Sequence, residues 1–207
     1  MTSVCDFGPV TIMYDERVLA PRMWTLLQSD WAADLCPHLP DGPILELFAG
    51  AGQIGLAAAV RARRRLVQVE ADAPAAEFAR RNAEAIGYAE HEVRAASIDN
   101  AVHPHEQFPL ILADPPYVRT GDLDDFPDDP PAAIDGGEDG LDLIRASLDV
   151  VRAHLAPGGA CLLQVRGEAQ AREVASLGRD ASPELRVVMT QSVDNDRAIV
   201  HLVHADL

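Results

Sequence analysis

The sequence predicts an α/β fold in which a seven-stranded, mostly parallel sheet carries helices on both faces. Short apolar segments alternate with longer segments of helical periodicity from residue 44 onward. Short strands separated by helices imply right-handed crossovers, and these make neighbouring strands parallel. Hydrophobic residues make up 48% of the 207 residues, which is enough for the core of one domain.

Seven apolar segments are predicted to form the strands: 44–48, 66–69, 91–96, 110–113, 160–165, 185–189 and 198–203. Four segments with helical patterns lie between most of them: 52–64, 73–86, 141–155 and 168–177. The last two apolar segments have no long helix between them, so we expect an antiparallel pair around Asp194 and Asn195. The predicted sheet then has six parallel strands and one reversed strand.

The first 40 residues are predicted to be a helical extension in front of a main domain at 41–207. Residues 21–36 can form a helix with Trp24, Leu27 and Trp31 roughly on one face. Prolines and a glycine at 37–43 then interrupt the chain before the first strand.

The charge balance is strongly acidic and narrows the expected partners. The chain has 17 basic and 33 acidic residues, which gives a net charge of −16 and a pI near 4.6. Proteins that bind phosphates usually carry a basic face, so this balance argues against nucleic acids and anionic membranes. Arg61 and Arg63 to Arg65 could form a local basic patch, but such a cluster is also typical of a solvated helix end.

Targeting and metal-binding patterns are not visible. There is no run of 18 apolar residues, and no basic stretch precedes an apolar one at the N-terminus. Cys5, Cys36 and Cys161 form no CxxC pair, and the histidines lack partners at metal-ligand spacing. We therefore predict a cytoplasmic protein without a membrane anchor or a metal.

A glycine turn follows the first strand of the predicted sheet. Gly50 and Gly52 lie between the strand and the next helix, where a ligand can approach the backbone and the helix N-terminus. Glu46 lies within the strand, and Glu70 ends the next strand, where a carboxylate can accept hydrogen bonds from ribose hydroxyls. This combination predicts a cofactor that contains adenosine. Because Gly50, Gly52 and Gly55 also match GxGxxG, the glycines alone do not separate NAD from S-adenosylmethionine.

The fourth strand ends in Asp114-Pro115-Pro116-Tyr117, at the same edge of the sheet as the glycine turn. The prolines make the turn rigid and leave carbonyls without a competing N–H. Asp114 and the Pro115 carbonyl can accept both hydrogens of a planar NH₂ group, and Tyr117 can stack on its plane. This arrangement favours methyl transfer from a sulfonium to an aligned nitrogen, which requires an in-line approach.

Residues 121–140, the acidic segment, contain eight acidic residues, three prolines and no basic residue. A connection of this length favours a lid or a substrate rim over a passive turn. A solvated loop without function is the alternative.

These motifs together resemble the class I S-adenosylmethionine-dependent methyltransferases, and more narrowly the HemK-type release factor glutamine methyltransferases. The similarity covers roughly residues 15–205. The matching motifs are VLAPR at 18–22 with Thr25, LELFAGAGQIGLA at 45–57, DPPYV at 114–118, AIDGGEDGLDLIR at 133–145 and NDR at 195–197. The resemblance implies a Rossmann-like methyltransferase domain at 41–207 that uses S-adenosyl-L-methionine.

The resemblance also implies roles for individual residues. The cofactor would be held by residues at the ends of four strands: Glu46, Phe48, Ala49, Gly50, Gly52, Ile54, Glu70, Ala71, Ser97, Ile98, Asp99 and Asp114. Near the adenine, Ser97 and Ile98 compete with Asp99. Asp114, Pro115, Pro116 and Tyr117 would hold the acceptor nitrogen, and Pro21, Arg22 and Thr25 would border the substrate together with Tyr117.

Three departures from the family pattern leave the acceptor open. Only about 40 residues precede the first strand, where the family has a separate helical domain. Asp114 replaces the usual Asn, and an ionised Asp can only accept hydrogen bonds, which suits an amino group or guanidinium better than an amide. The motifs also resemble ribosomal RNA guanine-amino methyltransferases.

Three hypotheses follow from these motifs. The first is N-methylation of a planar nitrogen, such as a glutamine amide, in a protein, peptide or small molecule. The second is methylation of a nucleic-acid amino group, for which a flipped base would enter the same site. The third is nucleotide binding without methyl transfer. The net charge of −16 favours the first over the second.

Overall fold

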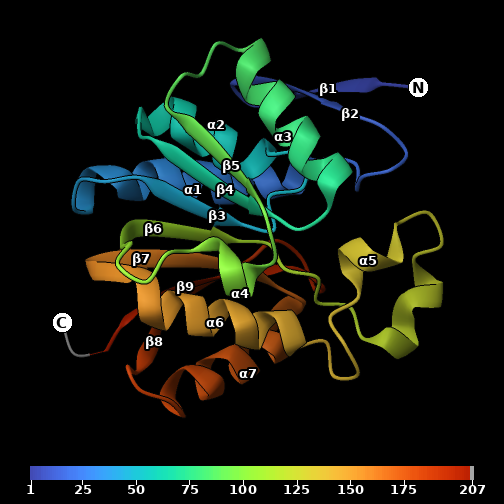
Figure 1. Ribbon diagram of the computed structural model, residues 1–207. Coiled ribbons are helices and arrows are strands. Elements are labelled where there is room, and N and C mark those ends of the chain that lie inside the picture. Colours follow the sequence, from blue (N-terminus) through green and yellow to red (C-terminus); the bar gives the residue numbers. More distant parts are fainter. Residues whose placement is uncertain (206–207) are drawn as a thin grey trace.

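The computed structural model describes residues 1–205, and its centre is a seven-stranded sheet of the order β5-β4-β3-β6-β7-β9-β8 (Figure 1). The strands are β3 (Ile44–Leu47), β4 (Leu66–Glu70), β5 (His91–Ala95), β6 (Phe108–Ala113), β7 (Leu155–Val165), β8 (Leu185–Ser192) and β9 (Ala198–His204). Only β9 runs antiparallel to its neighbours, β7 and β8. The predicted sheet of six parallel strands and one reversed strand is therefore confirmed.

Helices cover both faces of this sheet, as predicted (Figure 1). One face carries α1 (Leu26–Leu35), α2 (Gln53–Ala62) and α3 (Ala73–Ala85) over a core that includes Leu56 and Phe78. The other face carries α4 (Ile98–Ala101), α6 (Asp142–His154) and α7 (Gly167–Arg179) over a core that includes Ile144 and Val174. None of the helices in the described part of the chain is long and apolar enough to cross a membrane.

The first 40 residues contain a β-hairpin that was not predicted, in addition to the predicted helix. Strands β1 (Ser3–Phe7) and β2 (Val10–Tyr14) pair through a turn at Gly8, and Phe7, Val10 and Ile12 are buried in the same core as α2 and α3. The side chain of Asn82 on α3 joins the hairpin to the glycine turn, because it accepts from the Met13 amide at 2.8 Å and donates to the Ala51 carbonyl at 2.9 Å. The domain division at residue 40 stays a prediction.

Some element boundaries differ from the prediction. Strand β7 begins at Leu155, five residues before the predicted strand at 160–165, and the preceding helix ends at His154 and not at residue 155. Five short helices were not predicted: η1 (Met23–Thr25), η2 (Cys36–His38), α4, η3 (Thr120–Asp125) and α5 (Pro131–Ile134). Elements of three to six residues are too short to produce a periodic pattern.

The strand order creates a switch point between β3 and β6. The chain leaves β3 toward β4 and β5 on one side, and then crosses back to β6 on the other side. Leu47 of β3 pairs with Ala113 of β6, so the glycine turn and Asp114 leave neighbouring strands at the same edge. Ligands of open α/β sheets bind at such a point.

Candidate active site

The two glycines of the turn serve different purposes. Gly52 has a φ of +89°, and a Cβ there would approach the Ala79 Cα to 3.2 Å, so the packing of α3 requires its small size. Gly50 has a φ of +55°, and the nearest atom to a Cβ would be the Gln53 Oε1 at 4.0 Å. The space above Gly50 is therefore open to a ligand. The Gln53 Oε1 itself is buried and has no hydrogen-bond partner among the described residues.

Glu70 lies beside this turn, at the end of β4. Its carboxylate accepts hydrogen bonds from the backbone amides of Gly50 at 2.7 Å and Asp72 at 2.8 Å. Burial of the side chain raises the pKa of Glu70 above its usual value. Each carboxylate oxygen retains a second lone pair, so Glu70 can hold the turn and still accept hydrogen bonds from a ligand.

Glu46 lies behind the turn, where its side chain is buried. It accepts hydrogen bonds from the Gly55 amide at 2.8 Å and from the Gln68 side chain. Burial raises the pKa of Glu46 to about 8. A side chain at position 55 would overlap the Glu46 carboxylate, which explains the third glycine of the GxGxxG pattern. In this position Glu46 supports the turn from below, and its predicted contact with the cofactor stays a prediction.

The remaining predicted cofactor residues differ in how exposed their side chains are. The side chains of Ala49, Ile54 and Ile98 are buried, so only their backbones could meet a ligand. Phe48 is half-buried, whereas Ala71 and Ser97 are exposed. Asp99 is also exposed and lines a shallow depression of about 380 Å³ between α4 and α6.

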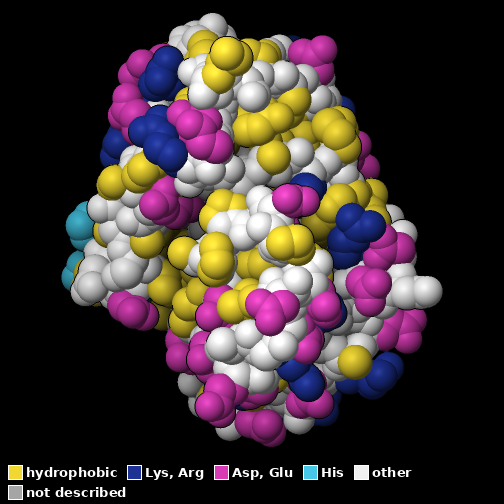
Figure 2. All heavy atoms as spheres, turned by 90° about the vertical axis from the view of Figure 1, so that its right-hand side faces the viewer, with side chains coloured by type: hydrophobic (Ala, Val, Ile, Leu, Met, Phe, Trp, Pro, Cys, Tyr) yellow, Lys and Arg dark blue, Asp and Glu magenta, His cyan; other side chains and the backbone are white. Residues whose placement is uncertain are grey.

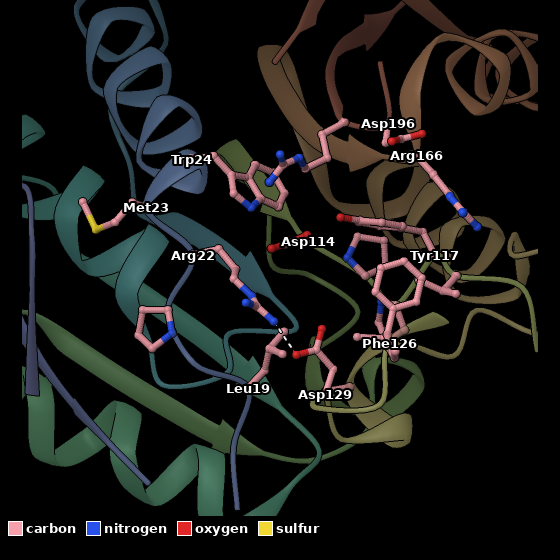
Figure 3. A pocket seen from close by; sticks show the side chains of 17 residues that line it. Leu19, Arg22, Met23, Trp24, Asp114, Tyr117, Phe126, Asp129, Arg166 and Asp196 are labelled. Carbon is pink, nitrogen blue, oxygen red and sulfur yellow. Dashed lines mark hydrogen bonds and ion pairs between the residues drawn. The ribbon is translucent and has the colours of Figure 1, made fainter. Parts of the chain in front are cut away.

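Asp114 forms part of the wall of a cavity of about 690 Å³ at the end of β6 (Figure 3). Pro115, Pro116 and Tyr117 also line the cavity, so the structure brings the whole predicted DPPY motif to one place. Neither carboxylate oxygen of Asp114 has a hydrogen-bond partner within residues 1–205. Burial raises the pKa of Asp114 to about 7 and that of the Tyr117 hydroxyl above its usual value.

The DPPY turn is held by the end of the acidic segment. The Gly136 amide donates to the Val118 carbonyl at 2.7 Å, and the Val118 amide donates to the Ile134 carbonyl at 2.9 Å. The side chain of Gln170 on α7 donates to the carbonyls of Tyr117 at 3.2 Å and Gly140 at 2.9 Å. The GGEDG sequence therefore packs directly against the backbone that carries the candidate catalytic residues.

Replacing Gly136 with Ala is expected to lower methyl transfer by about tenfold or more, because a 1 Å displacement of reacting groups costs up to about 100-fold. The new Cβ would lie 2.8 Å from the Pro116 carbonyl oxygen and 2.9 Å from the Tyr117 Cα. Steady-state kinetics would measure the loss. Gly121→Ala in the same segment is the control, because nothing lies within 4 Å of a Cβ there. Equal activity of the two variants would contradict the role of Gly136.

Aromatic and basic side chains complete the cavity wall. Trp24 and Phe126 line it together with the guanidinium groups of Arg22, Arg166 and Arg197. Trp24, Phe126 and Arg166 were not predicted as site residues. Trp24 and Phe126 come from segments that the sequence placed near the site, but no spacing rule singles them out.

The predicted substrate residues of the N-terminal segment behave differently from one another. Pro21 and Arg22 line the cavity, and their contact with the substrate stays a prediction. Thr25 does not line it: its side chain is buried, and its hydroxyl donates to the Arg22 carbonyl at 2.8 Å. Thr25 therefore fixes the backbone of Arg22 and does not face the cavity.

The acidic segment contributes Phe126, Asp129, Ala133 and Ile134 to the cavity wall. With η3 and α5 it stands out from the body of the protein (Figure 1). Asp129 forms an ion pair with Arg22, which connects the acidic segment to the N-terminal segment across the cavity (Figure 3). Asp122 pairs with Arg166 at 2.7 Å. Figure 2 looks onto this side of the molecule, where hydrophobic side chains gather at the centre of the face with acidic and arginine side chains around them.

Comparisons with known proteins show what this chain is similar to in sequence and fold. The family described as Conserved hypothetical protein 95 matches residues 28–126. A release factor glutamine methyltransferase of Mycolicibacterium smegmatis is 32% identical over 197 residues, which are 88% of this chain and 66% of the relative. A ribosomal protein uL3 glutamine methyltransferase of Bradyrhizobium diazoefficiens is 30% identical, over 93% of this chain and 63% of the relative. This chain thus spans slightly less than two thirds of these relatives.

Solved structures show the same fold. A 16S rRNA N2 methyltransferase of Thermus thermophilus, in complex with AdoMet and guanosine, has a TM-score of 0.70 at 18% identity, over 97% of this chain and 49% of the other. A methyltransferase of Pyrococcus furiosus has a TM-score of 0.67 at 20% identity, over 93% and 88% of the two chains. The fold is that of the class I methyltransferases. Within that class, the chain is similar to the HemK-like release factor glutamine methyltransferases.

Proposed function

We propose that this protein is an S-adenosylmethionine-dependent N-methyltransferase whose acceptor is a planar nitrogen, with a protein glutamine side chain as the first candidate. One observation carries this proposal: the carboxylate of Asp114 has no partner within residues 1–205 and lines a cavity beside the glycine turn. Asp114 is half-buried and lines the cavity, so an acceptor that enters the cavity and displaces water would satisfy its carboxylate by donating N–H groups.

The cofactor would lie over the ends of β3 and β4. The open space above Gly50 and the carboxylate of Glu70 suit the sugar and the chain of S-adenosylmethionine. When bound, S-adenosylmethionine supplies a methyl group on a positively charged sulfur. The reducing interior of the cell suits a protein whose three cysteines are all free, and we place it in the cytoplasm.

The chain's own residues would orient the acceptor nitrogen. Asp114 and the Pro115 carbonyl accept the two hydrogens of the NH₂ group, which aims the nitrogen lone pair at the methyl group. Positive charge develops on the nitrogen as the methyl group arrives, and the Asp114 carboxylate stabilises that charge in a site with little water. The nitrogen can lose its proton after the transfer, so the mechanism requires no separate general base.

The names of the relatives favour a glutamine amide as the acceptor, because both glutamine methyltransferases match most of this chain. A nucleobase amino group is the second candidate. It is favoured by Asp114 in the place of Asn, because a carboxylate accepts hydrogen bonds and cannot donate to an amide carbonyl.

A labelling experiment separates these acceptors. Purified protein is incubated with methyl-labelled S-adenosylmethionine and an extract of the source organism. Label that is lost on protease treatment supports the glutamine acceptor, and label that is lost on nuclease treatment supports the nucleobase. Label in the small-molecule filtrate means a metabolite acceptor. If no fraction carries label while the cofactor still binds, the proposed methyl transfer is contradicted.

Replacing Glu70 with Ala is expected to weaken cofactor binding by about 1–3 kcal/mol, the range for lost hydrogen bonds to a charged group. The variant removes a ribose partner and the carboxylate that holds the Gly50 amide. Isothermal titration calorimetry with S-adenosylhomocysteine measures the change. Glu77→Ala, an exposed position on α3, is the matched control. Unchanged affinity of the Glu70 variant would show that the ribose lies elsewhere.

A further inference from the structure

We propose that Trp24 and Tyr117 form two aromatic walls of a clamp for the planar acceptor, and that Trp24 determines acceptor affinity. The proposal rests on the proposed methyl transfer and adds a residue to it that neither the sequence motifs nor the comparisons assign. Trp24 and Tyr117 line the same cavity, and Asp114 lies between them (Figure 3).

The Trp24 ring is held in place by a residue near the C-terminal end of the sequence. The Arg197 guanidinium stacks over the ring, 4.8 Å from its centroid. Arg197 is itself fixed by Asp194, whose carboxylate accepts from the Arg197 Nε at 2.8 Å and from its terminal amino group. A cation over an aromatic face stabilises such an arrangement. The loop between β8 and β9 therefore positions a side chain that the N-terminal segment contributes.

The backbone of Tyr117, on the opposite wall of the cavity, is also held by hydrogen bonds. Gln170 accepts from the Arg166 amide at 2.6 Å and donates to the Tyr117 carbonyl, so α7 holds the backbone of this wall. The two rings come from segments 93 residues apart in the sequence (117 minus 24). Gln170 holds the Tyr117 backbone from outside the cavity, whereas Arg197 itself lines the cavity and covers one face of the Trp24 ring. An acceptor would therefore meet the Tyr117 ring and the uncovered part of the Trp24 ring.

The chemistry of this space selects a flat acceptor. Trp24 and Tyr117 offer aromatic surfaces, and the Asp114 carboxylate accepts N–H groups at the floor between them. Amides and aromatic rings are flat and stack on aromatic side chains, so such an acceptor can contact the rings while it donates N–H groups to Asp114. A glutamine side-chain amide is the acceptor that follows from the proposed function.

The test uses a bacterial release factor as the acceptor in steady-state kinetics. Trp24→Leu is expected to raise KM for the release factor by about tenfold, which corresponds to about 1.4 kcal/mol of lost stacking. Its S-adenosylhomocysteine affinity, measured by calorimetry, should stay within about twofold of wild type. Trp24→Phe should retain most of the affinity. Arg197→Ala should raise KM and Arg197→Lys should restore it, because Lys keeps the cation over the ring.

Trp31→Phe is the matched control, because Trp31 lies on α1 outside the cavity and is the second of two tryptophans. If Trp24→Leu has the same KM as Trp31→Phe, Trp24 is not a wall of the acceptor site. A melting temperature of Trp24→Leu close to that of wild type excludes misfolding as the cause of a raised KM.

A second readout separates this proposal from the glutamine proposal. In Trp31→Phe, Trp24 is the sole tryptophan, so its fluorescence reports on the cavity. If the wild type does not methylate the release factor, guanosine and N-acetylglutamine methylamide are titrated against this variant in the presence of S-adenosylhomocysteine. A saturable fluorescence change with either probe supports the clamp although the release factor acceptor is wrong. No change with both probes overturns the clamp as well.

Discussion

Asp114→Ala is expected to lower kcat by about 100- to 1,000-fold, the cost of removing one group that stabilises charge in the transition state. The variant loses the carboxylate that accepts a hydrogen of the acceptor nitrogen and faces the charge that develops on it. Affinity for S-adenosylhomocysteine should change by no more than about threefold, because Gly50 and Glu70 lie over the ends of other strands. Steady-state kinetics and calorimetry measure the two effects separately.

Asp128→Ala is the matched control for this prediction. Asp128 is an exposed residue of the acidic segment and forms no ion pair within the described residues. It changes the net charge of the protein by the same amount and leaves the cavity intact. Turnover of Asp114→Ala equal to that of this control would remove Asp114 from the mechanism.

The sheet and the DPPY motif could be predicted because both depend on local sequence. Strands such as Phe108–Ala113 are continuous apolar runs that are buried on both faces, and the helices between the strands are long enough to be periodic. Asp114 follows β6 directly, so the strand prediction alone places it beside the glycine turn. Motifs at the ends of parallel strands are brought together by the topology without any further information.

The cavity wall could not be predicted, because its members meet only through tertiary contacts. The Arg22–Asp129 pair joins residues 107 positions apart, and Arg166 meets Asp122 over 44 positions. Trp24 owes its orientation to Arg197, which lies in a turn near the C-terminal end. The hairpin β1–β2 was missed for a similar reason: its strands have five residues each, and their burial comes from α2 and α3.

Net charge turned out to be a weak guide to the site. The chain carries −16, and yet Arg22, Arg166 and Arg197 all border the one cavity that contains Asp114. Each of these arginines pairs with an aspartate, so the cavity wall is closer to neutral than the body of the protein. Average charge describes long-range attraction, whereas acceptor choice depends on the few groups inside the cavity.

The activity is expected to depend steeply on pH because of Asp114. Burial raises the pKa of Asp114 to about 7, so the carboxylate is mostly protonated below neutral pH. Only the ionised form stabilises the positive charge on the acceptor nitrogen, so kcat should fall by roughly tenfold per pH unit below about 7. Asp114→Asn should show a lower but flat profile over the same range. A profile that is flat in the wild type would contradict the role of the carboxylate.

The same carboxyl group should make the fold less stable as the pH rises. The native pKa of about 7 lies above the ordinary value of 3.8, so between these values the native state binds more protons than the unfolded chain. Stability therefore falls as the pH rises from about 4 to about 7, and then levels off for this group. Asp114→Asn removes this contribution and should have a higher melting temperature than the wild type at pH 8, with little difference near pH 4.

Glu46, with a pKa of about 8, also makes stability fall as the pH rises, and it does so in both proteins. The difference in melting temperature between the two proteins therefore reports on Asp114 alone. If the wild type and Asp114→Asn have the same melting temperature at both pH values, the pKa of Asp114 is not raised by burial. The carboxylate would then be solvated, which contradicts its proposed role at the floor of the cavity.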